Sequence, residues 1–194
     1  MEVHLNSIKS EFMKKLPEAT MYCGEYEQGF KMLGAIDYEH RGVRYYHGPT
    51  VQDREFHYIL YPWHSFERDV LPHIPRKGSF IDIGCGAGDK LALVKTHRPK
   101  LNVFGIEHDP WMVSWGQALV GDGVMLGDAF KTDYSTYDFI YAYWPIANVD
   151  EMNRLIGLVL QQKKAKAQFH LMGFNYYLDK KYKVTTKGLQ LHSI

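Results

Sequence analysis

Three glycines at alternate positions follow a short apolar run, and their spacing could hold a ligand against the main chain. The run Phe80-Ile-Asp-Ile83 is typical of a buried parallel strand, and Gly84, Gly86 and Gly88 come directly after it. Residues 89 to 95 then have the pattern of a helix. A strand, a glycine-rich turn and a helix form the ligand crevice of open α/β sheets. Glycine is needed there because the backbone turns sharply and comes close to the ligand.

Acidic residues around this loop indicate the charge of the ligand. The dinucleotide-binding fingerprint has its third glycine where this chain has Asp89. That carboxylate would lie near a helix N-terminus and would repel a pyrophosphate bound there. Asp82, on the predicted strand, adds a second negative charge. The loop therefore favours a cationic ligand. S-adenosylmethionine is one, because it carries a positive sulfonium and a positive ammonium and has no phosphate.

The same residues resemble a known family. The segment Phe80-Ile-Asp-Ile-Gly-Cys-Gly-Ala-Gly88 is similar to motif I of the class I S-adenosylmethionine-dependent methyltransferases, a hydrophobic-hydrophobic-Asp-x-Gly-x-Gly-x-Gly pattern. The resemblance covers about residues 75 to 174. It implies S-adenosylmethionine as cofactor and a methyltransferase activity. It also implies an α/β fold, a doubly wound and mostly parallel sheet, here with a shortened C-terminal end.

Further matches extend the predicted cofactor site. Glu107 ends a predicted strand over 102–107, about 20 residues beyond the loop, where nucleoside-binding α/β folds place a carboxylate for the ribose hydroxyls. The resemblance implies that role for Glu107. It also implies that Asp128, after a third strand over 123–127, accepts from the adenine amino group, with Ala129 or Phe130 against the ring. The predicted cofactor-binding residues are Asp82, Gly84, Cys85, Gly86, Gly88, Glu107, His108, Asp128 and Ala129.

The segment after the fourth predicted strand, 138–143, is the expected acceptor side. Methyl transfer is a displacement at the sulfonium methyl, so the enzyme mainly aligns the nucleophile and excludes water. Amino-methylating relatives carry Asn- or Asp-Pro-Pro-Tyr here, whereas this chain has Tyr143-Trp-Pro-Ile146, which weakens an adenine-N6 interpretation. Tyr143 and Trp144 could contact an amine or a flat ring, or could equally pack under the N-terminal segment. His47 is a candidate base.

Strands and helices alternate along the rest of the chain, which predicts a parallel sheet with right-handed crossovers. Asn148 and Glu151 form a capping-box-like pair at the start of one helix. Other helices are predicted over 88–98 and 110–120, and a fifth strand over 167–174. Only 175–181 remains for a helix after that strand, and 184–194 could form a hairpin. Residues 1–74 are predicted to form a helical and hairpin cap on a core of 75–194, as one compact domain.

Composition limits the functional classes. The chain has 194 residues, of which 45% are hydrophobic, and these values suit one globular domain with a small appendage. A net charge of +1 argues against a strong nucleic-acid footprint, so a small molecule or a protein side chain is favoured over DNA as acceptor. No apolar run approaches the roughly 18 residues of a membrane span, and no signal peptide is evident. Two cysteines make no disulfide framework. We therefore expect a cytoplasmic protein, without a membrane partner.

Two other functions stay open at this point. A nicotinamide-dependent oxidoreductase would also use a strand, a glycine loop and a helix, but Asp89 and the missing third fingerprint glycine count against it. A non-catalytic S-adenosylmethionine-binding or structural module would account for the short C-terminal end and for the altered segment after the fourth strand. No His, Cys, Asp or Glu pair has convincing metal spacing. The methyl acceptor and the oligomeric state do not follow from the sequence.

Overall fold

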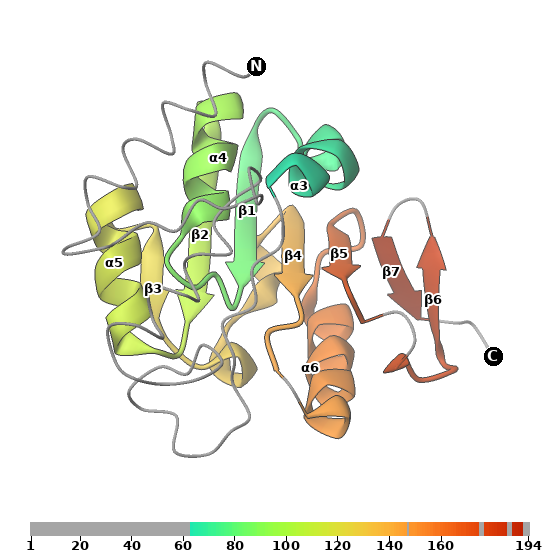
Figure 1. Cartoon of the computed structure of the whole chain (residues 1–194). Helices are drawn as coiled ribbons and strands as arrows, with labels where there is room; N and C mark the ends of the chain where they lie inside the picture. Colours follow the sequence, from blue (N-terminus) through green and yellow to red (C-terminus); the bar gives the residue numbers. More distant parts are fainter. Residues whose placement is uncertain (1–62, 147, 175–176, 186–187, 192–194) are drawn as a thin grey trace.

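The fold is built on a seven-stranded sheet with the order β3-β2-β1-β4-β5-β7-β6 (Figure 1). The computed structural model describes residues 63–146, 148–174, 177–185 and 188–191. Its strands are β1 (Gly78–Ile83), β2 (Leu101–Glu107), β3 (Val124–Leu126), β4 (Phe139–Tyr143), β5 (Gln168–Met172), β6 (Tyr182–Thr185) and β7 (Gly188–Leu191). Among the described strands, β6 alone runs antiparallel to its neighbour. The predicted mostly parallel α/β sheet is therefore confirmed.

Helices cover both faces of this sheet, as a doubly wound fold requires. The helices are α3 (Trp63–Asp69), α4 (Asp89–His97), α5 (Pro110–Val120) and α6 (Val149–Gln162). Successive strand residues point to opposite faces. Phe80 and Phe139 accordingly lie in one buried cluster with Leu91 of α4. Ile81 and Ile140 lie in a second buried cluster with Ile156 of α6.

Helix α6 begins where its sequence predicts. The Asn148 side chain accepts hydrogen bonds from the backbone N–H groups of Asp150 and Glu151, each at 3.0 Å. These bonds satisfy N–H groups that have no partner within the helix. The reciprocal half of a capping box is not formed, because the Glu151 carboxylate accepts instead from Arg154 at 2.9 and 3.0 Å.

The connections after β3 and β5 contain less helix than the alternating pattern suggests. Between β3 and β4 the chain makes two short 3-10 turns, η2 (Ala129–Lys131) and η3 (Tyr134–Thr136). The Asp128 and Asp133 side chains cap these turns. After β5, the described residues 177–181 contain no α-helix. The predicted C-terminal hairpin is present as β6 and β7 and begins two residues earlier than expected.

Helix α3 packs on the same face of the sheet as α4. The Phe66 ring meets the Tyr141 ring edge-on, with ring centroids 5.1 Å apart. The Arg98 guanidinium donates to the carbonyl oxygens of Leu71 and Ile74, at 2.9 and 3.2 Å. These contacts hold the chain that enters β1. The cap predicted before residue 63, including His47, lies outside the described residues.

Candidate active site at the carboxyl edge of the sheet

The three loop glycines all adopt left-handed backbone conformations. The φ angles are 73° at Gly84, 53° at Gly86 and 74° at Gly88. Other residue types adopt such angles only with strain, so the tight turn from β1 into α4 depends on glycine. A Cβ at Gly88 would also lie 3.2 Å from the side chains of Val120 and Val124, so α4 packs closely there. The sharp turn that the sequence predicts after β1 is therefore present.

Glu107 joins the end of β2 to this loop. Its carboxylate accepts from the backbone N–H of Gly86 at 2.8 Å, and from those of His108 and Asp109 at 2.8 and 2.9 Å. Burial raises the pKa of Glu107, and the three N–H groups partly offset that effect. The acid predicted to meet a ribose therefore also organises the loop backbone. The His108 side chain is exposed.

Four ionisable side chains are gathered beneath the loop. Asp82 is 3% exposed, Asp89 is 2% exposed and Lys90 is 4% exposed. The Asp89 carboxylate forms an ion pair with the Lys90 ammonium. Burial raises the pKa of Asp82 well above its ordinary value, and the negative charges of Asp89 and Glu107 raise it further. The positive charge of Lys90 lowers that pKa and partly offsets these effects. The cluster holds three carboxyl groups and one ammonium group, so a positively charged ligand would stabilise the ionised carboxylates.

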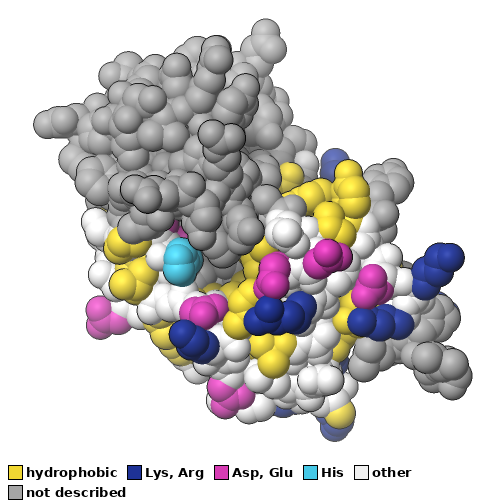
Figure 2. All heavy atoms as spheres, turned by 90° about the horizontal axis from the view of Figure 1, so that it is seen from below, with side chains coloured by type: hydrophobic (Ala, Val, Ile, Leu, Met, Phe, Trp, Pro, Cys, Tyr) yellow, Lys and Arg dark blue, Asp and Glu magenta, His cyan; other side chains and the backbone are white. Residues whose placement is uncertain are grey.

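Figure 2 shows the face at which the parallel strands end. The described side chains on this face are acidic, basic and hydrophobic, and its basic side chains do not form one continuous patch.

The Cys85 side chain fills space beneath the loop. A Cβ on Gly105 of β2 would lie 2.6 Å from both the Cβ and the Sγ of Cys85, so the thiol occupies the room that this glycine leaves. Burial raises the pKa of the Cys85 thiol, and the negative charge of Glu107 raises it further. Cys85 is a free, buried thiol. The side chain therefore contributes packing between the glycine loop and β2.

Asp128 and Ala129 lie in the turn after β3. Asp128 Oδ1 accepts from the backbone N–H of Phe130 at 2.8 Å, which gives the aspartate a turn-forming role. Its other oxygen lies 3.6 Å from the Lys131 ammonium. The Ala129 carbonyl accepts from the Tyr134 hydroxyl at 2.7 Å. The turn is thus held by a hydrogen bond within it and by a second one from Tyr134 of η3.

Tyr143 and Trp144 pack against opposite faces of the sheet. Tyr143 contacts the buried cluster under α4, whereas Trp144 contacts the cluster under α6. Trp144 has a φ of 43°, an unusual angle for a bulky residue and one that often marks functional sites. Its ring meets Phe174 and Tyr177 edge-on, with centroids 5.1 and 5.3 Å away. Tyr143 and Trp144 therefore do not lie on the same side of the sheet, and Trp144 has other aromatic partners.

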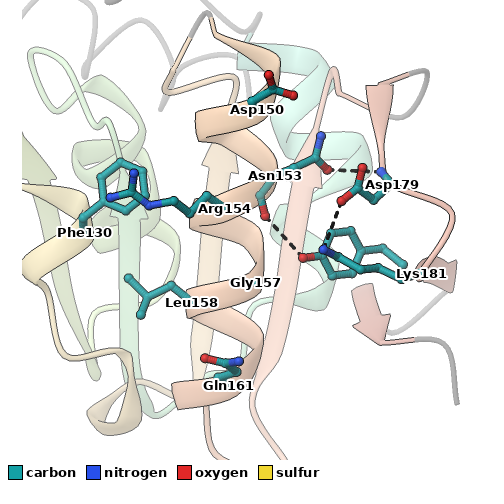
Figure 3. Close-up of a pocket in the computed structure, with 10 residues that line it drawn as sticks. Phe130, Asp150, Asn153, Arg154, Gly157, Leu158, Gln161, Asp179 and Lys181 are labelled. Atoms are coloured by element: carbon teal, nitrogen blue, oxygen red, sulfur yellow. Dashed lines mark hydrogen bonds and ion pairs between the residues drawn. The ribbon is translucent and has the colours of Figure 1, made fainter.

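Tyr177 is a residue that the sequence reasoning missed, and a buried asparagine holds its backbone in place. Asn153 Nδ2 donates to the carbonyls of Val149 and Tyr177, both at 3.0 Å. Asn153 Oδ1 accepts from the backbone N–H of Asp179 at 3.1 Å (Figure 3). The backbone carbonyl of Asn153 accepts from the Tyr182 hydroxyl at 3.2 Å. We call this set of Asn153 hydrogen bonds the clamp. An asparagine inside an amphipathic helix is the one sequence signal that could have indicated it.

A cavity of about 580 Å³ runs along the outer side of α6 (Figure 3). Its basic groups have acidic neighbours, because Arg154 pairs with Glu151 and Lys181 pairs with Asp179. The Arg154 guanidinium also lies over the Phe130 ring, 4.4 Å from its centroid. The cavity shares no lining residue with the glycine loop, so it is separate from the cluster of buried charges. The lining residues are Phe130, Asp150, Asn153, Arg154, Gly157, Leu158, Gln161, Asp179, Lys181 and Tyr182.

No helix among the described residues is long and apolar enough to cross a membrane. No group of three or more His, Cys, Asp or Glu side chains there is arranged to hold a metal ion.

Comparison with known proteins places the fold. Neither the comparison with protein-family models nor that with curated proteins finds a match. The RNA methyltransferase from Salinibacter ruber, in complex with S-adenosyl-L-homocysteine, is 18% identical over 68% of this chain and 90% of its own, with a TM-score of 0.50. The PH0226 protein from Pyrococcus horikoshii OT3 is 16% identical over 74% of this chain and 66% of its own, with a TM-score of 0.51.

A third similar structure is larger. The mitomycin 7-O-methyltransferase MmcR is 19% identical over 57% of this chain, with a TM-score of 0.47, and this chain spans 36% of its length. At these identities the likeness concerns the fold. This chain therefore has the fold of the class I S-adenosylmethionine-dependent methyltransferases.

Proposed function

We propose that the protein binds S-adenosylmethionine over the carboxyl ends of β1 and β2 and transfers its methyl group to an acceptor near the end of β4. The observation that carries the proposal is the 2.8 Å hydrogen bond from the Gly86 N–H to the Glu107 carboxylate. It unites the glycine loop and the strand-end acid at the edge where α/β folds of this kind bind nucleosides. The bound S-adenosyl-L-homocysteine of the Salinibacter ruber protein supports the same ligand class.

The chemistry of the loop fits this cofactor. S-adenosylmethionine would supply a methyl group made electrophilic by its sulfonium. Asp82, Asp89 and Glu107 are carboxylic acids around the loop; a bound cation would stabilise their ionised forms, whereas a phosphate would be repelled by them. This balance favours S-adenosylmethionine over a nicotinamide dinucleotide. The remaining predicted contacts, those of His108, Asp128 and Ala129, would surround the nucleoside.

Aromatic side chains near the end of β4 would shape the acceptor side. The Trp144 ring is half-buried, whereas Tyr177 is 50% exposed and presents its ring to solvent. An amine or a flat ring would find favourable contacts on such a surface. The protein would act there by aligning the nucleophile and excluding water. A small molecule or a protein side chain remains the favoured acceptor, with Tyr143 as a further contact residue and His47 as a candidate base.

Binding calorimetry tests the cofactor. The wild-type protein is expected to bind S-adenosylmethionine and S-adenosylhomocysteine at about micromolar Kd and not to bind NAD. Glu107→Ala removes the loop contact and the proposed ribose acceptor, so affinity should fall about tenfold or more. Glu151→Ala, on the exposed side of α6, is the matched control and should leave affinity unchanged. Tight NAD binding, or unaltered affinity in Glu107→Ala, would contradict the proposal.

Transfer is tested separately from binding. The protein is incubated with methyl-labelled S-adenosylmethionine and with fractions of a lysate, one of small molecules and one of proteins. Labelled products, identified by their mass, would name the acceptor. Strong S-adenosylmethionine binding with no labelled product in either fraction would favour a non-catalytic binding module.

A further inference from the structure

Lys90 is a buried lysine at the start of α4, two residues beyond the last loop glycine. Lysine is rarely this buried unless it is paired, and its partner is the Asp89 carboxylate. An ammonium group has three N–H donors. Within the described part of the chain, the bond to Asp89 is the only hydrogen bond of Lys90 Nζ. Two donors of a nearly inaccessible ammonium group are therefore left for another acceptor.

The surroundings of Lys90 indicate which kind of acceptor would suit these two donors. Asp82 interacts electrostatically with Asp89, Lys90 and the half-buried Glu107, so the surroundings of Lys90 are acidic. The methionyl end of S-adenosylmethionine carries an ammonium and a carboxylate. The cluster can accept the ammonium, but its acids would repel the carboxylate unless a cation met it. Among the described residues of this cluster, Lys90 is the one cation.

We propose that Lys90 Nζ binds the carboxylate of the methionyl group of S-adenosylmethionine, with Asp89 holding the ammonium group of Lys90 in position. This inference rests on the proposed function. It assigns Lys90 a role in selecting a zwitterionic cofactor, beyond the attraction of the acidic loop for any cation. Hydrogen bonds between charged groups in a buried site are the strong ones, so the effect on affinity is measurable.

The alternative is that Lys90 only neutralises Asp89. Decarboxylated S-adenosylmethionine separates the two roles, because it keeps the sulfonium and the amine and lacks the carboxylate. If Lys90 only neutralised Asp89, this more positive analogue would bind at least as tightly as the cofactor. If Lys90 binds the carboxylate, wild-type protein should prefer S-adenosylmethionine by about tenfold or more in calorimetry. Equal or tighter binding of the analogue would overturn the proposal.

Lys90→Met gives the second test. Binding of S-adenosylmethionine should weaken about tenfold or more, while binding of the decarboxylated analogue should stay equal or tighten, so the wild-type preference disappears. Equal weakening of both ligands, or S-adenosylmethionine affinity within about twofold of wild type, would overturn the proposal. Lys100→Met, an exposed lysine before β2, is the control and should keep the preference.

The outcomes separate this inference from the proposed function. Wild-type protein that binds neither nucleoside would refute S-adenosylmethionine binding itself. Wild-type protein that binds S-adenosylmethionine without preferring it over the analogue would refute the Lys90 role alone. Thermal melting checks that Lys90→Met is folded, and the wild-type comparison stands even if this variant does not fold.

Discussion

Pro145 rests directly against Gly84, since a Cβ added at Gly84 would lie 2.7 Å from the Pro145 Cβ. The turn after β4 is thus in contact with the first glycine of the loop after β1. The two strands are neighbours in the sheet, with Ile83 paired to Ala142. The segments predicted to form the acceptor side and the cofactor side are therefore in direct contact, and a change at Gly84 disturbs both.

Gly84→Ala is expected to destabilise the protein by roughly 2–5 kcal/mol. The φ of 73° contributes about 1–2 kcal/mol of strain for alanine, and the clash with Pro145 adds about 1–3 kcal/mol. Gly121→Ala is the matched control, because Gly121 has a φ of 80° and nothing within 4 Å of its added Cβ. It should lose only the strain, about 1–2 kcal/mol. Urea unfolding measures both variants, and equal losses would show that the Pro145 contact is unimportant.

Asp82→Asn is expected to stabilise the protein at neutral pH while weakening S-adenosylmethionine binding. Burial and the charge of Asp89 raise the pKa of Asp82, so the folded protein holds that proton more tightly than the unfolded chain does. Ionised Asp82 therefore lowers stability above the raised pKa, and this penalty disappears as pH falls through that pKa toward the ordinary value. We expect a gain of roughly 0.5–2 kcal/mol at pH 7 that shrinks in acid.

Two measurements check the Asp82 prediction. Urea unfolding at neutral and acidic pH gives the stability difference, and calorimetry gives the affinity for S-adenosylmethionine. Asp122→Asn, at an exposed position, should alter neither quantity. A less stable Asp82→Asn protein at neutral pH would mean that the carboxylate is required by the fold.

His170 is expected to make the protein less stable in mild acid. Burial, and secondly the charge of His73, lowers the pKa of His170 to about 4, so the folded protein keeps the ring neutral. The unfolded chain takes up that proton near pH 6.5. Stability should therefore fall as pH decreases from about 6.5 toward 4, by at most about 3 kcal/mol from this group.

His170→Gln should remove that part of the pH dependence. The measurement is the free energy of unfolding in urea between neutral pH and pH 4. His108→Gln, which changes an exposed histidine, should keep the wild-type slope. If the free energy of unfolding changed with pH in the same way in wild type and His170→Gln, the lowered pKa of His170 would be contradicted.

Asn153→Ala is expected to cost about 2–3 kcal/mol of stability. The substitution removes two donated hydrogen bonds and one accepted bond, each contributing about 1 kcal/mol, and releases the segment that carries Tyr177. Asn102→Ala, at an exposed position on β2, should change stability by less than about 0.5 kcal/mol. Urea unfolding compares the two, and a loss below about 1 kcal/mol in Asn153→Ala would show that the clamp is dispensable.

Local signals predicted much of the architecture. The left-handed angles at Gly84, Gly86 and Gly88 follow from the spacing of a residue type that alone adopts them readily. The start of α6 follows from Asn148, whose side chain caps its own helix. Both features are determined by neighbours in the chain, so a sequence pattern is sufficient to predict them.

Other features were not predictable in this way. The alternating pattern did not indicate the two 3-10 turns between β3 and β4, which are held by bonds such as Tyr134 Oη to the Ala129 carbonyl. The placement of Trp144 beside Tyr177 joins segments on either side of α6 and β5. The Asn153 bonds to residues 177 and 179 also span more than 20 positions. Contacts of this range depend on how the elements pack.

The sequence by itself determined that a glycine turn follows a buried strand, that acids surround it, and that strands and helices alternate into a parallel sheet. Only the tertiary structure decided that Asp82, Asp89, Lys90 and Glu107 share one charged cluster at the loop, and that Pro145 packs against Gly84. The physical reason is that turn conformation depends on backbone sterics of a few consecutive residues. Burial and charge balance depend instead on which distant strands lie side by side.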